Sequence, residues 1–381
     1  MSPMPVSSSH SVALNTGLQM PLLGLGTYKL CGPADVYQAV DAALAAGYRS
    51  FDSAAVYRNE ADLGKALREL LPKHGLTRED VFITSKLGPK DQGMRAMEGA
   101  LHSLSQLDLE YIDLYLIHWP GTQGLPVADD CNPGNRAQSW ASLEELHGQG
   151  KLRAIGVSNY TPAHMSALMQ SCKVPPAVLQ VEFHPRLCQP ELRNLCKEFG
   201  VCFQAYSSLG KGELLTDPVI LEVAKNCERT PAQVLLRWAV QQGVPVLPKS
   251  SNPERILQNA EVFDFTLSDP DMDRLSALDC GHRFCWDPSE RFLILTPLSS
   301  RLTNSSLILR SCRPYFLAAH REGGADKDRP LNGKPSVGVP TSSSPLACSS
   351  TSLEMVEAMD SEFSLTRPAN ERIKDKWNRQ A

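Results

Sequence analysis

Short apolar runs alternate with longer amphipathic runs along most of this chain, starting near residue 22. The apolar runs have the length of buried strands, while the amphipathic runs repeat their apolar positions at helical spacing. This alternation is typical of a parallel sheet whose neighbouring strands are joined by helical crossovers. The expected strands are 22–26, 48–52, 81–86, 111–118, 154–157, 178–183, 201–205 and 245–248.

Helices are expected between these strands, and proline in the first turn marks the start of several of them. Eight alternations ending near residue 280 predict an α/β fold, a (β/α)8 TIM barrel with a right-handed crossover at each step. The alternative is an open, doubly wound sheet. The expected helices are 34–46, 61–71, 94–107, 140–148, one starting at Thr161-Pro162, 191–199, 219–227, and one starting at Thr230-Pro231.

The two ends of the chain differ from this pattern. Two short extended pieces, 10–15 and 17–20, flank a turn and predict an N-terminal β-hairpin that caps the bottom of the barrel. Pro and Ser accumulate after residue 290 and the apolar period is lost, which indicates a mostly disordered C-terminal tail. We therefore expect a flexible N-terminus at 1–9, a barrel domain at 10–290 and a tail at 291–381.

Composition narrows the possible partners. The chain has 381 residues and a formal net charge of -4, so it offers no electrostatic argument for binding nucleic acid. No apolar stretch is long enough to span a membrane, and the polar first ten residues do not form a secretory signal. The 11 scattered cysteines fit a reducing compartment, so we expect a cytoplasmic protein, and a monomer because coiled-coil heptads are absent.

A metal site is not expected. Cys280, His282 and Cys285 are closely spaced, as metal ligands often are. A fourth ligand is missing, however, and buried or unused cysteines are the commoner explanation for such a group.

Ionisable side chains follow three consecutive expected strands: Asp52, Lys86 and His118. The carboxyl ends of barrel strands lie side by side, so these groups should converge, and Tyr57 adds a phenol nearby. Each alone is more often structural, but together they favour a proton-transfer site for carbonyl reduction. We expect Tyr57 to be the general acid, Lys86 to lower its pKa from about 10, Asp52 to balance the charge of Lys86, and His118 to orient the carbonyl.

The chain resembles the aldo-keto reductases over residues 10–288. The resemblance implies an NADPH-dependent (β/α)8 oxidoreductase in which Asp52, Tyr57, Lys86 and His118 have the roles given above. It looks like the short-loop, glyoxal-reductase and prostaglandin-F-synthase-like branch of that family. The matching words are Gly-Leu-Gly-Thr-Tyr at 24–28, Phe-Asp-Ser-Ala-Ala-Val-Tyr-Arg-Asn-Glu at 51–60, Ile-Thr-Ser-Lys at 83–86, Leu-Ile-His-Trp-Pro at 116–120, Gly-Val-Ser-Asn-Tyr at 156–160, Leu-Gln-Val-Glu-Phe-His-Pro at 179–185, Ala-Tyr-Ser-Ser-Leu-Gly at 205–210 and Leu-Pro-Lys-Ser at 247–250.

A cofactor site is expected without a Gly-x-Gly-x-x-Gly segment, which the chain does not have after a strand. Polar groups at the ends of strands five to seven should hold a nicotinamide, and the helix start at Asn252 with two flanking cations should bind the 2′-phosphate of NADPH. The expected cofactor-binding residues are Gly26, Thr27, Tyr28, Asp52, Ser158, Asn159, Gln180, Tyr206, Ser207, Leu209, Lys249, Ser250, Ser251, Asn252, Arg255, Gln258 and Asn259.

The substrate pocket is expected to be small and partly aromatic, which suits aldehydes, ketones and dicarbonyls such as methylglyoxal. Its expected lining is Tyr28, Val56, Tyr57, His118, Trp119 and Trp286. The expected activity is therefore NADPH-dependent reduction of such carbonyls to alcohols. The alternative is a cofactor-binding regulatory, redox-sensing subunit with little turnover, which the unmatched tail keeps open.

Overall fold

Parallel strands form the centre of the computed structural model, in which residues 10–289 are described. Strands that are consecutive in the sequence pair in consecutive order, as crossovers of one hand require. The expectations for residues 1–9 and for the tail lie outside the described residues. The paired strands are β3 (Leu25–Gly26), β4 (Ser50–Asp52), β5 (Phe82–Leu87), β6 (Ile112–Ile117), β7 (Leu152–Ser158), β8 (Val178–Glu182) and β9 (Cys202–Tyr206).

The sheet closes through Val246, which bridges to Leu23 on one side and to Ala205 on the other. The backbone N–H of Gly24 donates to the carbonyl of Val246 at 2.9 Å, and that of Ala205 donates to Pro245 at 2.8 Å. The expected eighth strand is therefore reduced to a short bridging segment. The fold is a (β/α)8 TIM barrel, and the alternative of an open sheet is wrong.

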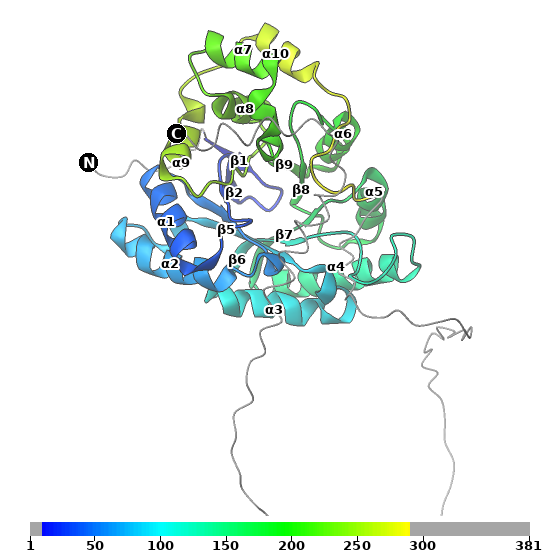
Figure 1. Ribbon diagram of the computed structural model, residues 1–381. Helices are drawn as coiled ribbons and strands as arrows, with labels where there is room; N and C mark the ends of the chain where they lie inside the picture. Colours follow the sequence, from blue (N-terminus) through cyan, green and yellow to red (C-terminus); the bar gives the residue numbers. More distant parts are fainter. Residues whose placement is uncertain (1–9, 290–381) are drawn as a thin grey trace, which may run out of the picture. The chain divides into compact units, whose positions relative to one another are not determined.

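Helices surround the strands (Figure 1). The helix expected at 140–148 begins earlier, because the side chain of Asn132 accepts from the N–H of Thr122 and donates to Pro126. Helix α10, with one buried side chain, was not predicted. The helices are α1 (Gly32–Ala45), α2 (Glu60–Lys73), α3 (Ala96–Leu107), α4 (Cys131–Gly148), α5 (Pro162–Ser171), α6 (Pro190–Phe199), α7 (Pro218–Asn226), α8 (Pro231–Val240), α9 (Pro253–Ala260) and α10 (Asp269–Ser276).

The expected N-terminal hairpin is confirmed, with β1 (Ser11–Ala13) antiparallel to β2 (Gln19–Pro21). Met20 at its centre is fully buried in a cluster with Phe82 and Val178, the first residues of β5 and β8. Because these residues begin their strands, the hairpin caps the N-terminal end of the barrel. The opposite end, where the strands finish, is left for the polar groups described next. Within residues 10–289, no helix has the length and apolar character needed to cross a membrane.

Candidate active site

The ends of β4 and β5 bring a carboxylate and an ammonium together inside the barrel. Lys86 Nζ donates to Asp52 Oδ1 at 2.5 Å and to the carbonyl of Ser53 at 2.9 Å. The side chain of Lys86 is 0% exposed and that of Asp52 is 5% exposed. Burial lowers the pKa of Lys86, and the charge and hydrogen bond of Asp52 oppose that effect. Asp52 therefore balances the charge of a buried cation.

Tyr57 lies at the end of a short 3₁₀ turn, Ala55–Tyr57, that follows β4. Lys86 Nζ donates to its hydroxyl at 3.5 Å. The turn is fixed by Asn59, whose Oδ1 accepts from Ser53 Oγ at 2.8 Å and whose Nδ2 donates to the carbonyl of Thr27 at 2.9 Å. The structure thus brings the phenol to the Asp52–Lys86 pair.

The phenol of Tyr57 is a weaker acid here than in water. Burial raises its pKa well above the ordinary value, and the negative charge of Asp52 raises it further. The net direction is upward although the ammonium of Lys86 lies 3.5 Å from the hydroxyl, because burial and the charge of Asp52 outweigh it. Tyr57 consequently remains protonated at neutral pH, the state that a proton donor requires.

His118 follows β6 and meets Tyr57 edge-on, with ring centroids 5.6 Å apart. Burial, and then the positive charge of Lys86, hold the pKa of His118 well below its usual value. The imidazole is therefore neutral. Its Nδ1 is buried and has no hydrogen-bond partner among the described residues. A neutral imidazole beside the phenol fits the expected role of orienting a carbonyl oxygen.

The four polar residues expected around a nicotinamide belong to one hydrogen-bonded network. Asn159 Nδ2 donates to Ser158 Oγ at 3.2 Å and to the carbonyl of His118 at 2.9 Å, while Tyr206 OH donates to Asn159 Oδ1 at 2.8 Å. Gln180 Nε2 donates to Asp52 Oδ2 at 2.9 Å. Asn159 and Gln180 therefore bond directly to catalytic residues, and Ser158 and Tyr206 are linked to them through Asn159.

The expected phosphate site lies at the start of α9. The side chain of Asn252 accepts from the N–H of Arg255 at 3.1 Å and caps the helix. Lys249 and Arg255 are both exposed, and neither makes an ion pair within residues 10–289. Exposed, unpaired cations beside a helix N-terminus form a site suited to an anion. Ser251 and Gln258 are also exposed there, Ser250 is half-buried, and Asn259 is buried.

The remaining expected cofactor residues lie near the end of β3 and after β9. Thr27 Oγ1 donates to the carbonyl of Asp52 at 2.9 Å. A Cβ on Gly26 would lie 2.9 Å from the carbonyl oxygen of Leu247, so the position favours glycine. Ser207 has a positive φ of 51° and contacts Cys285, and Leu209 is partly buried.

The residues expected to line the substrate pocket form a chain of rings. The Tyr28 and Tyr57 centroids are 5.1 Å apart, those of His118 and Trp119 are 6.3 Å apart, and those of Trp119 and Trp286 are 6.1 Å apart. Val56 and Tyr28 are each 39% exposed. The side chains around the Tyr57 phenol are therefore largely aromatic.

Three buried polar residues near the site were missed: Asn59, Glu182 and Gln204. Gln204 Oε1 accepts from Gln180 Nε2 at 2.9 Å. Asn59 and Glu182 lie within motifs that resemble those of the aldo-keto reductases, and those motifs could have identified them. No sequence feature could have identified Gln204, because a glutamine in an apolar strand does not indicate which residue it bonds.

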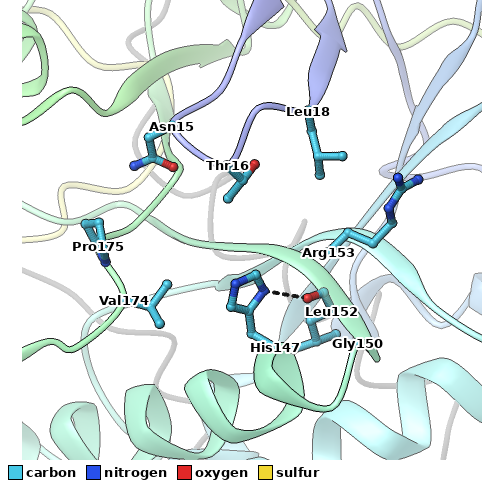
Figure 2. A pocket seen from close by; sticks show the side chains of 9 residues that line it. All are labelled: Asn15, Thr16, Leu18, His147, Gly150, Leu152, Arg153, Val174 and Pro175. Carbon is cyan, nitrogen blue, oxygen red and sulfur yellow. Dashed lines mark hydrogen bonds between the residues drawn. The ribbon is translucent and has the colours of Figure 1, made fainter.

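A recess of about 480 Å³ lies away from these groups, at the N-terminal end of the barrel (Figure 2). It is lined by Thr16 of the hairpin turn, Leu152 at the start of β7, and Pro175 before β8. Catalytic residues of such barrels lie at the other end. Within the described part of the chain, no three His, Cys, Asp or Glu side chains are grouped as metal ligands.

Comparison with known proteins gives one family. The model of the Aldo/keto reductase family matches residues 22–279. A glyoxal reductase of Bacillus subtilis is 42% identical over 288 residues, covering 75% of this chain and 99% of that protein. A 9,11-endoperoxide prostaglandin H2 reductase of Trypanosoma cruzi is 40% identical over 287 residues, covering 74% and 96%.

Solved structures agree with these relatives. An aldo-keto reductase from a deep-sea metagenome library is 39% identical with a TM-score of 0.66, covering 72% of this chain and 96% of that one. The aldose reductase of Schistosoma japonicum is 37% identical with a TM-score of 0.66, covering 72% and 93%.

Proposed function

The chain belongs to the aldo/keto reductase family, and on that premise we propose that it uses NADPH to reduce small aldehydes, ketones or dicarbonyls to alcohols, with Tyr57 as the general acid. One observation supports this most directly. Lys86 Nζ lies 2.5 Å from Asp52 and 3.5 Å from the phenol, beside a neutral His118. A positioned proton donor, a cation and an uncharged hydrogen-bonding group are what carbonyl reduction needs.

The protein's own groups manage the proton and the oxygen. The N–H of neutral His118 donates to the carbonyl oxygen and orients it against the hydroxyl of Tyr57. NADPH, when bound, supplies the hydride that the carbonyl carbon accepts. As negative charge develops on the oxygen, Tyr57 gives up its proton, because an alkoxide is a stronger base than a phenolate even when the pKa of the phenol is raised. The phenolate left behind faces the ammonium of Lys86, which stabilises it.

The fit to NADPH rests on the donors at two places. Ser158, Asn159 and Gln180 provide buried amide and hydroxyl groups for the nicotinamide end. Lys249 and Arg255 provide two exposed cations without ion pairs in the described part of the chain, beside a capped helix start, for the 2′-phosphate. A phosphate carries charge that NADH does not have at that position, so the cations favour NADPH.

The aromatic surroundings of the phenol suit small carbonyl compounds, and a relative is named a glyoxal reductase. The relatives reported above are reductases, and none of them supports the alternative of a regulatory subunit. The proposal includes a monomer acting in the cytoplasm; light scattering at the mass of one chain would support the monomer.

A panel of carbonyl compounds tests the function. We expect oxidation of NADPH, followed by nicotinamide absorbance, with methylglyoxal and with aromatic aldehydes, and slower oxidation of NADH. Tight nucleotide binding without reduction of any compound would instead favour a regulatory protein.

A further inference from the structure

The segment 280–289, called the strap here, follows α10 and passes close to the catalytic groups. Cys285 Sγ lies 3.3 Å from Ser207 Oγ, just after β9. The ring of Trp286 meets that of Trp119 edge-on at 6.1 Å, and Trp119 neighbours His118. The strap therefore contributes an aromatic wall that lies in the sequence more than 160 residues after His118.

The strap is attached to the barrel through Glu182, the last residue of β8. Glu182 Oε1 accepts from the N–H of Phe284 at 2.7 Å, and both carboxylate oxygens accept from the N–H of Cys285 at 3.2 Å. His184 Nε2 lies 3.0 Å from the same Oε1. The side chains of Glu182 and His184 are both 0% exposed.

A fully buried carboxylate is costly unless strong hydrogen bonds compensate it, and bonds from backbone N–H groups to a charged acceptor are strong ones. Here the N–H groups of two successive strap residues, Phe284 and Cys285, supply such bonds to Glu182. Packing reinforces them, since the Phe284 ring lies 4.9 Å from that of His184. Nearer α10 the strap also bonds to the barrel through its backbone: the N–H of His282 donates to the carbonyl of Arg186 at 3.0 Å, and that of Cys280 donates to the same carbonyl at 3.4 Å.

We propose that Glu182 is a positioning residue that fixes the strap, so that Trp286 stays beside Trp119 and forms the wall against which aromatic carbonyl substrates pack. This rests on the proposed function. Glu182 does not touch the reacting atoms, and it meets a cofactor-binding residue through the strand pairing of β8 with Tyr206 of β9. It acts on substrate choice through the two backbone N–H groups next to Trp286.

Substitution of Glu182 by Gln keeps the shape but places an NH₂ group where donors already point, so at least one bond to the strap is lost. We expect the KM for an aromatic aldehyde to rise roughly three- to tenfold, the size of an aromatic contact. The kcat for that aldehyde, and both constants for methylglyoxal, should stay within about twofold of wild type, since the proton-transfer groups are untouched.

A second readout does not depend on activity. Hydrogen–deuterium exchange of the peptide covering residues 280–289 should become faster in Glu182→Gln, because the amides of Phe284 and Cys285 lose their acceptor. This measurement tests the role of Glu182 independently of the proposed function. If the protein reduced no carbonyl, the proposed function would be contradicted, but hydrogen–deuterium exchange would still test whether Glu182 holds the strap.

Glu144→Gln is the matched control. Glu144 Oε1 also accepts from two successive backbone N–H groups, those of Lys173 and Val174, at 2.6 and 2.9 Å, but far from the strap in sequence. It should change neither strap exchange nor the KM ratio between the two substrates. Unchanged exchange in Glu182→Gln, or an unchanged KM ratio, would overturn the proposal. Should that variant not fold, Trp286→Ala tests the wall directly: an unchanged KM for the aromatic aldehyde would also overturn it.

Discussion

Gln180 Nε2 lies 2.9 Å from Asp52 Oδ2, while Oδ1 of the same carboxylate accepts from Lys86. Gln180 is in turn 2.9 Å from Gln204 Oε1, and Gln204 Nε2 reaches the sulfur of Met20 in the hairpin at 3.7 Å. These contacts form a chain inside the barrel from the hairpin to the catalytic pair. Both oxygens of Asp52 are thereby engaged, which fixes the carboxylate against the buried ammonium.

Asp52→Asn should change the pH dependence of turnover. Burial already lowers the pKa of Lys86, and Asp52 is the main group opposing it. Without that charge the pKa falls further, so Lys86 loses its proton at lower pH and no longer stabilises the phenolate. We expect the alkaline limb of the kcat profile to move down by roughly one pH unit or more. A profile with lower kcat but the same alkaline limb would contradict this role.

Lys249→Ala combined with Arg255→Ala should weaken NADPH binding selectively. Loss of two cations near a phosphate should raise the KM for NADPH about tenfold, equivalent to about 1.4 kcal/mol, and leave that for NADH unchanged. Arg274→Ala, which removes a partly exposed cation on α10 that is paired with Glu222, is the control. Equal rises in KM for NADPH and NADH would show that Lys249 and Arg255 do not recognise the 2′-phosphate.

His164 should make the free energy of unfolding decrease as the pH falls below neutrality. Burial, and then Arg136, lower its pKa to about 4. The unfolded chain, with a histidine pKa of about 6.5, therefore binds more protons between these values, so the free energy of unfolding falls as pH decreases from about 6.5 to 4. In His164→Gln, urea unfolding at pH values across this window should show a smaller fall. Identical pH dependence in both proteins would count against the account.

The alternation of apolar and amphipathic runs was enough to predict the fold, and the catalytic residues could be predicted because three consecutive strand runs end on or near an ionisable residue. Asp52 is the last residue of β4, Lys86 is the second-last of β5 and His118 directly follows β6, and a parallel barrel brings such strand ends together. The extent and pairing of the individual barrel strands were harder to predict from the sequence. Of the expected first strand, 22–26, only Leu25 and Gly26 pair with β4, while Leu22 and Gly24 bond to the eighth segment at Val246.

Other features depend on contacts that no local pattern contains. The early start of α4 depends on Asn132, whose partners lie in the preceding loop. The bonds of Glu182 join residues more than 100 positions apart. The direction of the Tyr57 pKa also required the structure, since the sequence places a cation nearby but does not reveal how deeply the phenol is buried.

Removal of residues 291–381 should leave the reduction of small aldehydes intact. Every residue placed in the site, including Glu182 and Trp286, lies before residue 290. We expect kcat and KM for methylglyoxal within about twofold of the full chain, since every group assigned to the site is retained. A collapse of the rate, in a protein with unchanged circular dichroism, would mean that the tail contributes to the site.

Tyr57→Phe tests the central claim most directly, because it removes one hydroxyl and keeps the ring. We predict that the single-turnover rate of carbonyl reduction falls roughly 100-fold or more, as expected for a positioned general acid, while the NADPH dissociation constant and thermal stability stay those of the wild type. A variant that binds NADPH and reduces carbonyls at the wild-type rate would contradict the account.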